Sequence, residues 1–230
     1  MTILAVHNRY RYRGGEDLLF DAECALLEER GHRVIRYVED NARIASMGAA
    51  RLLSASLWNR QAYRELRALI AQERPSLVHF HNTFPLLSTA ALAAARDAGV
   101  PVVETLHNFR LVCVNGLLLR RGSPCEKCVG RRLPWPGVWH ACYRRSRAAS
   151  LWAALSLAAR RLMGPWHDGV EAYIVVSRFA RRVLQRAGLP ERKLMLKPNF
   201  VHPDPGLGDG TGGYALYAGR LSEEKGVLVL

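Results

Sequence analysis

The stretch SLVHFHNTFPLLSTAALAAARDAGVPVVETLHN, residues 76–108, decides the fold. It opens with a short apolar run over 76–81, which is typical of a buried strand. An alanine-rich segment over 86–98 predicts a helix, and Gly99 follows at a place where helices commonly end. A second apolar run over 100–106 predicts another strand. A strand, a helix and a strand in this order favour two parallel neighbours joined by a right-handed crossover.

The same alternation continues on both sides of this stretch. Apolar runs of strand length recur at residues 3–6, 32–38, 173–176 and 194–197. Segments with apolar residues at helical spacing lie at residues 16–30, 58–73, 148–163 and 178–187. Short strands that alternate with helices form a parallel sheet covered on both faces. The sequence therefore predicts a doubly wound, Rossmann-like α/β domain over residues 1–201.

The composition restricts the class of protein. The chain has 230 residues, of which 49% are hydrophobic and 23% charged, as in a folded globular protein. No apolar run reaches the roughly 18 residues of a transmembrane helix, and the N-terminus lacks the pattern of a secretory signal. Five cysteines without an export signal argue against a disulfide framework and for a reducing, cytoplasmic compartment. The formal net charge of +13 favours acidic partners: sugar nucleotides, anionic lipid head groups or nucleic acid.

Two neighbouring strands of the predicted sheet end in a histidine followed by an asparagine. His81 and Asn82 end one strand, and His107 and Asn108 end the next. In a doubly wound sheet, ligands bind beyond the carboxyl ends of the strands, so these side chains should lie together at one site. A histidine there can orient a hydroxyl group or accept a hydrogen bond from a sugar. The alternative for each of these residues is a purely structural hydrogen bond.

Two further features suit the phosphates of a ligand. Gly14 and Gly15 precede a helix, where glycine lets the backbone approach a ligand closely and the helix N-terminus favours an anion. Arg220 and Lys225 flank a predicted strand-to-helix turn and could clamp a diphosphate as a planar fork and a point charge. The alternatives are a tight turn at the glycines and a charged helix start at the second pair.

The segment GRLSEEKG, residues 219–226, resembles the donor-phosphate motif of the large family four of retaining glycosyltransferases, which have the GT-B fold. Other segments agree with that family in order and spacing: GGE (14–16), LVHFHN (77–82), TLHN (105–108), VSRFARRVL (176–184) and KPNFVHP (197–203). The resemblance implies that residues 1–201 are the acceptor-side domain and that residues 202–213 are a linker. Residues 214–230, with a strand over 214–218, would begin a donor-binding domain. We therefore expect a truncated chain that is inactive by itself.

The resemblance also implies an activity. Such enzymes transfer a sugar from a nucleotide-diphosphate sugar to a hydroxyl acceptor with retention of configuration and without an essential catalytic metal. The acceptor would be a polysaccharide or a lipid-linked molecule, as in polysaccharide biosynthesis. The family's roles fall on matching positions: donor binding on Gly14, Gly15, Arg220 and Lys225; catalysis on His107; and an acceptor-side or structural role on His81, Asn82 and Asn108. Asn108 departs from the family's usual aspartate, and Phe200 and His202 depart from a hinge motif that contains Asn199.

A long basic segment, residues 108–147, interrupts the regular alternation of strands and helices and forms a Cys-rich insertion. It holds four of the five cysteines, Cys113, Cys125, Cys128 and Cys142, with the spacing C-x11-C-x2-C-x13-C. This spacing predicts a structural zinc site, with an iron–sulfur cluster as an alternative because it takes the same ligands. Four unrelated thiols or one disulfide are the remaining alternatives. The fifth, Cys24, is predicted to be a buried core thiol.

Tryptophans accompany the basic residues of this part of the chain, at positions 135, 139, 152 and 166. Aromatic and basic residues together can dock on the anionic inner surface of a membrane; alternatively, the tryptophans pack the insertion onto the domain. Stacking on single-stranded nucleic acid is less favoured. The rival to a glycosyltransferase is therefore a non-catalytic, metal-stapled basic module that binds membrane or nucleic acid. A dinucleotide-dependent oxidoreductase is disfavoured because the sequence has no G-x-G-x-x-G motif.

Overall fold

The computed structural model describes residues 1–163, 169–219, 221–222 and 225–227. Six parallel strands form the main sheet in the order β2-β1-β3-β4-β7-β8. They are β1 (Thr2–Arg9), β2 (Arg33–Asp40), β3 (Leu77–Phe80), β4 (Val102–Leu106), β7 (Ala172–Val175) and β8 (Leu194–Leu196). The chain adds β2 on one side of β1 and the later strands on the other, so the switch point lies between β1 and β3. The predicted Rossmann-like fold is confirmed.

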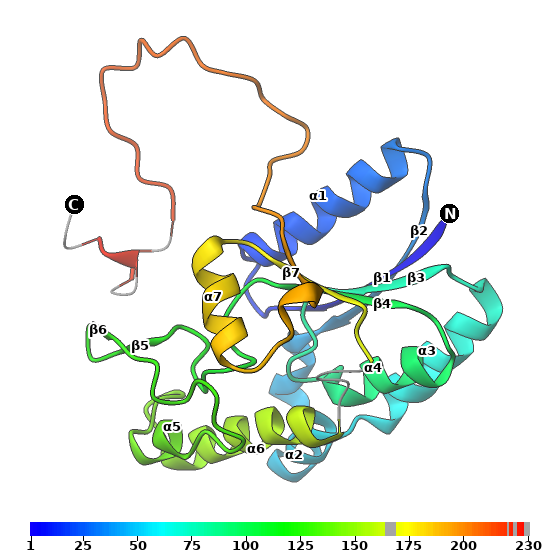
Figure 1. Cartoon of the computed structure of the whole chain (residues 1–230), viewed down its shortest axis with the longest axis vertical. Helices are drawn as coiled ribbons and strands as arrows, with labels where there is room; N and C mark the ends of the chain where they lie inside the picture. The colour runs from blue at the N-terminus through cyan, green and yellow to red at the C-terminus, as the bar shows by residue number, and fades with distance from the viewer. Residues whose placement is uncertain (164–168, 220, 223–224, 228–230) are drawn as a thin grey trace.

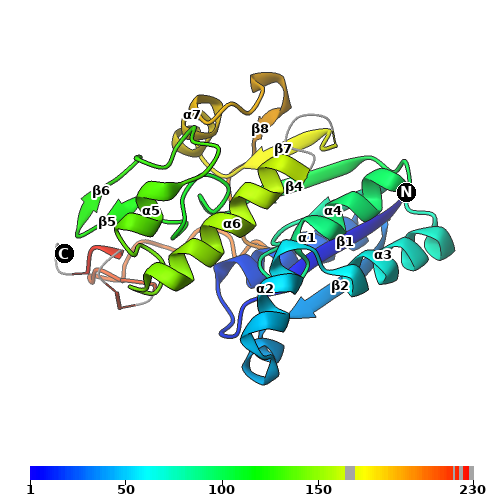
Figure 2. The ribbon, with the colours of Figure 1, turned by 90° about the horizontal axis from the view of Figure 1, so that it is seen from below.

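Helices cover both faces of this sheet (Figure 1). The α-helices outside the insertion are α1 (Gly15–Glu29), α2 (Ala49–Leu57), α3 (Arg60–Glu73), α4 (Ser88–Asp97), α6 (Arg147–Met163) and α7 (Arg178–Arg186). Two 3₁₀ turns, η1 (Asn41–Ser46) and η2 (Glu191–Lys193), complete the set. Figure 2 shows α2, α3, α4 and α6 side by side over one face of the sheet, and Figure 1 shows α1 on the other.

The alanine-rich helix α4 lies at the centre of the helical layer. Its residues 88–95 are all buried, because α4 packs against α2, α3 and α6 as well as the sheet. Small side chains let several neighbours approach one helix closely, which explains the composition that predicted it. On the other face, Phe20 and Cys24 of α1 pack on Ala5 of β1, and Cys24 is 1% exposed. The prediction of a core thiol at Cys24 is confirmed.

The insertion has little regular structure. A two-stranded hairpin, β5 (Leu119–Arg120) with β6 (Ser123–Pro124), and the five-residue helix α5 (Trp135–Trp139) are its elements. Leu111, Val112, Cys113 and Leu118 of the insertion belong to the main hydrophobic core, and Val114 and Cys128 form a separate small cluster with two alanines of α6. A cluster of this size removes little apolar area from water.

Two parts of the chain differ from the predictions. The helix α2 and the turn η1 precede α3 in a stretch for which no element was predicted. The predicted strand over 214–218 is wrong: residues 202–219 contain no strand and run outside the sheet as an extended loop (Figure 1). A strand is stable only when its backbone pairs with a neighbour, and no described strand lies beside this segment. Among the described helices, none has the length and hydrophobicity needed to cross a membrane.

Candidate functional site

The carboxyl ends of β1, β3 and β4 converge at the switch point and bring together side chains from distant parts of the sequence. His7 lies near the end of β1, His81 directly follows β3, and His107 directly follows β4. The register aligns Val6 with Phe80. Side chains just beyond these residues therefore meet at one edge of the sheet, where α/β proteins bind ligands. The structure thus confirms that the two predicted histidine–asparagine pairs lie together.

The histidines at this edge form a chain of touching rings. Nδ1 of His81 lies 3.1 Å from Nε2 of His107, and the two rings stack with centroids 5.3 Å apart. The ring of His79 lies 4.4 Å from that of His81. His7 reaches Oδ1 of Asp17 through Nε2 at 2.8 Å. His7 and His79 had no predicted role at the site, although their positions on strands that end at this edge are a signal that could have found them.

Burial keeps these rings uncharged at neutral pH. It lowers the pKa of His107 to about 4. Burial, and then the neighbouring histidines, lower the pKa of His81 well below its usual value. A neutral imidazole has one N–H donor and one acceptor nitrogen, so His81 and His107 share one hydrogen bond and each keeps one further nitrogen. His107 is the more exposed of the two and is the ring that a ligand can reach.

The two asparagines have different positions in the hydrogen-bond network. Asn82 donates from Nδ2 to the Asn8 carbonyl at 2.7 Å and accepts from the Phe84 backbone N–H at 3.1 Å. These bonds tie β1 to the loop after β3, and Asn82 is buried. Asn108 instead donates from Nδ2 to Oε1 of Glu16 at 2.9 Å. Asn108 therefore joins the end of β4 to the first turn of α1.

That bond places the Gly14–Gly15 loop beside the histidines. The Gly14 N–H donates to Oδ2 of Asp17 at 2.8 Å, and Asp17 also contacts His7. Nothing lies within 4 Å of the place where a Cβ on Gly15 would sit. No described part of the chain therefore requires glycine at position 15.

A cavity of about 70 Å³ lies beside the histidines. Its lining includes His81, His107 and Asn108 from the strand ends and Glu104 and Arg160 beneath them. Arg160 comes from α6 and pairs with the buried Glu104, and its Nη1 also donates to Oγ1 of Thr83 at 2.9 Å. Burial raises the pKa of Glu104, and the Arg160 guanidinium opposes that shift. The pair therefore adds almost no net charge to the cavity.

Arg110 is the cation in this lining that has no carboxylate partner. Within the described chain, no carboxylate oxygen lies within 4.0 Å of its guanidinium, and its Nε and Nη1 are buried without hydrogen-bond partners. The guanidinium lies over the Phe84 ring, 4.5 Å from its centroid, and 5.6 Å from the centroid of Tyr143. Aromatic faces hold the cation in place without neutralising it. The cavity therefore has a net positive charge.

One group of potential metal ligands is present at this edge, and a lysine lies beside its carboxylate. Among the described residues, ligand atoms of Glu23, His79 and His81 lie within 4.8 Å of one another. The Lys197 ammonium lies 3.0 Å from Oε2 of Glu23, and Nε2 of His79 lies 2.8 Å from Oγ1 of Thr105. A cation already neutralises the carboxylate, which argues against metal binding here.

A comparison with protein families places residues 21–205, most of the chain, in one of them, described as Glycosyltransferase Family 4. The chain belongs to Glycosyltransferase Family 4. The predicted family resemblance is confirmed. A comparison with curated proteins gives no significant match.

Solved structures with low sequence identity also resemble the chain. A UDP-GlcNAc 2-epimerase from Methanocaldococcus jannaschii has a TM-score of 0.47 and 9% identity, over 85% of this chain and 45% of that one. The same enzyme from Rickettsia bellii has a TM-score of 0.45 and 10% identity, over 86% and 45%. Anabaena HepE in complex with UDP has a TM-score of 0.40 and 15% identity, over 86% and 44%. Each match thus covers less than half the length of the other protein.

The predicted diphosphate clamp of this family member is only partly described. Arg220 lies outside the described residues. Lys225 is exposed in a short turn, where its N–H donates to the Ser222 carbonyl at 2.9 Å. No hydrogen bond or ion pair between described residues links Lys225 to the Gly14–Gly15 loop. The clamp stays a prediction.

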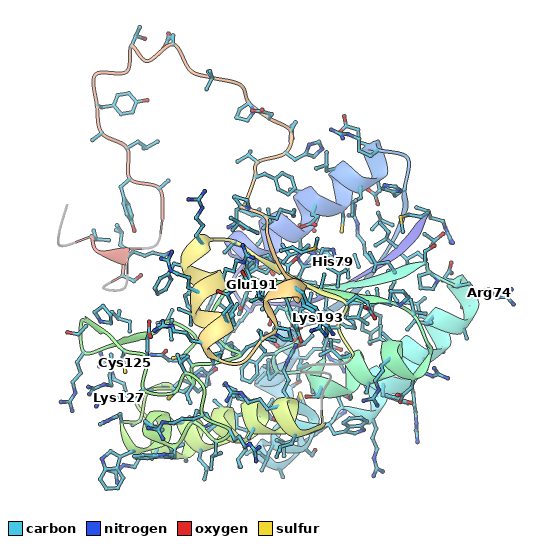
Figure 3. All side chains as sticks on the ribbon, viewed as in Figure 1. Arg74, His79, Cys125, Lys127, Glu191 and Lys193 are labelled. Atoms are coloured by element: carbon cyan, nitrogen blue, oxygen red, sulfur yellow. The ribbon has the colours of Figure 1, made fainter. Side chains whose placement is uncertain are left out.

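The four insertion cysteines and the exposed Trp135 and Trp139 are not among the residues that line the cavity beside the histidines. Figure 3 shows Cys125 and Lys127 in the insertion, separated from His79 in the sheet. Trp135 and Trp139 are 53% and 66% exposed. Trp152 packs on Phe84 and donates from Nε1 to Oγ of Ser56 at 2.7 Å, so it joins the insertion side of α6 to the domain. The fourth tryptophan, at position 166, lies outside the described residues.

Proposed function

We propose that this domain is the acceptor-side half of a retaining glycosyltransferase that uses a nucleotide-diphosphate sugar. Family membership supports sugar transfer. The observation that carries the proposal is the uncharged His107 at the cavity, bonded to His81 and next to the Gly14–Gly15 loop. One edge of the sheet thus offers a hydrogen-bonding group for a sugar, a helix N-terminus for an anion and a cavity for a second substrate.

In this proposal His107 positions a sugar hydroxyl and acts as a neutral group. His81 engages Nε2, so Nδ1 is the ring atom left for a ligand. A neutral ring can donate or accept a hydrogen bond at the reacting centre, whereas an imidazolium could only donate. An imidazolium would also repel the positive charge that develops on the sugar in the transition state. Burial keeps the His107 ring neutral and so avoids that repulsion.

The donor phosphates would bind at the N-terminus of α1. Backbone N–H groups and the helix dipole favour an anion there, and the open space at Gly15 suits close approach of a phosphate. Arg220 and Lys225 would hold the diphosphate and stabilise the leaving nucleoside diphosphate, an electrostatic role that needs no metal.

The acceptor would enter the cavity and present a hydroxyl group to the donor sugar. The unpaired Arg110 favours an acceptor that has a negative group, such as the phosphate of a lipid-linked acceptor or the carboxylate of an acidic polysaccharide. The exposed Trp135 and Trp139, with Arg131 and Arg147 over their rings at 5.5 and 5.6 Å, would dock the domain on an anionic membrane.

The test is sugar transfer by the chain together with any residues that its gene encodes beyond Leu230. Purified protein is incubated with a panel of nucleotide-diphosphate sugars and phosphate-bearing acceptors, and the product is analysed for anomeric configuration. His107→Ala should lower kcat about 100-fold, the scale of a lost polar group at a reacting centre. His32→Ala, in the turn after α1, is the matched control and should leave kcat unchanged. Transfer at the wild-type rate by the His107 variant, or inversion of configuration, would contradict the proposal.

Membrane docking has its own assay. Flotation with anionic and with neutral liposomes should show binding to the anionic ones only. The double substitution of Trp135 and Trp139 by serine should abolish it, whereas Trp58→Ser, on the end of α2, should not. Anionic binding without any sugar transfer would instead support the rival, a non-catalytic basic module.

A further inference from the structure

Four cysteines separated by up to 29 positions surround one small cavity in the insertion. Its lining contains Cys113, Cys125, Cys128 and Cys142, together with Arg120 and Lys127. These four residues, the cysteine quartet, are free thiols. Cys24, the remaining cysteine, lies on the opposite face of the sheet under α1. The fold therefore gathers the insertion cysteines and no others.

Backbone hydrogen bonds hold three of the four quartet members in defined turns. Cys113 donates its N–H to the Phe109 carbonyl at 2.8 Å, and Cys125 donates to Leu118 at 2.7 Å beside the β5–β6 hairpin. The N–H of Cys142 bonds the Gly137 carbonyl at 2.9 Å at the end of α5. The main chain thus fixes the backbone positions of these three cysteines.

Gly137 provides close packing beside Cys128. A Cβ on Gly137 would lie 2.5 Å from a Val114 methyl carbon and 3.5 Å from the Cys128 sulfur. Only a residue without a side chain lets α5 approach this sulfur so closely. The turn at Cys128 and helix α5 are thereby brought to the same cavity wall as the turn at Cys113.

The quartet sulfurs do not all lie as close together as the ligands of a tetrahedral zinc site. Sulfurs bound to one zinc ion at about 2.3 Å lie roughly 3.8 Å apart, and no three quartet sulfurs lie within 4.8 Å of one another. The Cys113 thiol now donates to Oδ1 of Asn115 at 2.9 Å, and the Cys128 thiol lies 3.8 Å from the Pro134 carbonyl. These are weak thiol hydrogen bonds, which metal bonds would replace if the quartet bound zinc.

We propose that the cysteine quartet binds one structural zinc ion. Four thiols lose four protons and form four Zn–S bonds, which leaves a site with a net charge of −2. Arg120 and Lys127 line the same cavity, and Nε of Arg120 is buried without a hydrogen-bond partner. A tetrathiolate supplies an acceptor for that N–H and a negative charge for both cations. This pairing also gives a reason for the concentration of basic residues in the insertion.

The metal would add to the stabilisation that the insertion receives from the main hydrophobic core through Leu111, Val112, Cys113 and Leu118. Five of the seven described non-glycine residues with positive φ lie in the insertion: Leu118, Arg121, Ala141, Arg144 and Arg145. Each left-handed residue of this kind costs about 1 kcal/mol, and the small apolar cluster around Val114 offers little compensation. Structural zinc sites stabilise small segments of this kind outright, because the unfolded segment holds no preformed site.

The first test is the metal content of the wild-type protein, purified under reducing conditions without chelator. Inductively coupled plasma mass spectrometry should find one zinc per chain and no stoichiometric iron. Cys125→Ser and Cys128→Ser should each lose the zinc, and Cys24→Ala, the matched control, should keep it. Wild-type protein without zinc after incubation with zinc salt, or zinc retained by both quartet variants, would overturn the proposal. Iron with acid-labile sulfide would also overturn it, in favour of a cluster.

A cobalt exchange separates loss of the site from loss of the fold. The wild-type protein reconstituted with Co²⁺ should show the intense sulfur-to-cobalt absorption of a tetrahedral thiolate site, and the absence of these bands would contradict four thiolate ligands. The measurement needs no variant, so it does not depend on whether a variant folds. It is also independent of the proposed function, because it requires no transfer activity.

The proposed zinc site shares a lining residue with the proposed acceptor cavity. Val114 lines both cavities, and Cys113 follows Arg110 by three residues. If the proposed function holds, chelation of the zinc should raise the acceptor KM at least several-fold, and added zinc should restore it, with little change in donor KM. Zinc present without this effect would leave the metal site standing and contradict only its link to the acceptor.

Discussion

The strand-end edge and the insertion hold their polar groups by different means. At the edge, His81, Asn82 and Glu104 are at least nine-tenths buried, and their partners come from the strands, α6 and the loop after β3. In the insertion, two two-residue strands and a five-residue helix surround four thiols, and the buried apolar cluster is small. The hydrophobic core of a parallel sheet positions the first set, whereas backbone hydrogen bonds in short turns position the second set, which we propose binds zinc. Damage at the edge should therefore spread through the domain, and damage in the insertion should stay local.

The largest effect is expected from breaking the buried ion pair under the edge. Arg160→Met leaves the Glu104 carboxylate without its cation, which should lower the free energy of unfolding by about 3–5 kcal/mol at pH 7.5. Burial already raises the pKa of Glu104. A raised folded-state pKa means that stability is present at low pH and is lost as the pH rises. The deficit should thus shrink at pH 5, as measured by urea unfolding.

Two further variants test whether the loss of stability comes from the unpaired charge of Glu104. They also compare it with the effect of breaking an ion pair in the insertion. Adding Glu104→Gln to Arg160→Met should recover much of the stability, because no buried charge then remains. Glu126→Gln breaks the exposed pair of the insertion with Arg186, at 2.7 Å, and should cost at most about 1 kcal/mol. An Arg160 variant as stable as the wild type would contradict the claim that damage at the strand-end edge destabilises the whole domain.

Next in size is the loss of the unpaired cation in the cavity. Arg110→Met should raise the KM for a phosphate-bearing acceptor about tenfold, or about 1.4 kcal/mol, because a charge-assisted hydrogen bond is lost. The KM for the donor should change little, and Arg110→Lys should keep part of the effect. Arg74→Met, at an exposed position that Figure 3 shows projecting away from the sheet edge, is the control. An unchanged acceptor KM in Arg110→Met would contradict an anionic acceptor.

The pH dependence of transfer should reveal the buried state of His107. The pKa of His107 is lowered to about 4, so its neutral form is present in the folded protein at all higher pH. Below about pH 6.5 the unfolded chain takes up the proton first, so this group's contribution to stability is full above pH 6.5 and declines toward pH 4. The rate should therefore stay level from pH 7.5 to 5.5, and a drop centred near 6.5 would show an exposed, ordinary histidine.

The smallest effect is expected at the glycine loop. Gly15→Ala meets no atom within 4 Å and should stabilise α1 by up to about 1 kcal/mol, because alanine favours the helix. The added methyl group would occupy space proposed for the donor phosphates, so the donor KM should rise several-fold. Gly48→Ala, at the N-cap of α2 with φ −66°, is a control with equal room and no proposed ligand. A donor KM that is the same in both variants would place the phosphates elsewhere.

Most of the sheet could be predicted because its signals are local. The alternation of apolar runs and helical segments is visible within windows of 10 to 30 residues, and it placed each strand of the main sheet within a few residues of its observed bounds. The prediction of a strand over 214–218 was wrong because it also rested on a local signal alone. Tyr214 and Leu216 have the composition of a strand, but a strand forms only beside a partner, and no described strand is placed there.

The sequence by itself determined the parallel sheet, the edge at which polar residues follow the strands, and the spacing of four cysteines in one insertion. Only the tertiary structure decided that His7 and His79 lie beside the two predicted histidines. It also decided that Asn82 makes structural hydrogen bonds and that Arg110 lines a cavity without a carboxylate partner. It also brought the cysteine quartet to the lining of one cavity. The physical reason is that the hydrophobic periodicity of a segment indicates only which of its residues are buried. Which side chains meet depends on strand order and on helices that pack across the sheet.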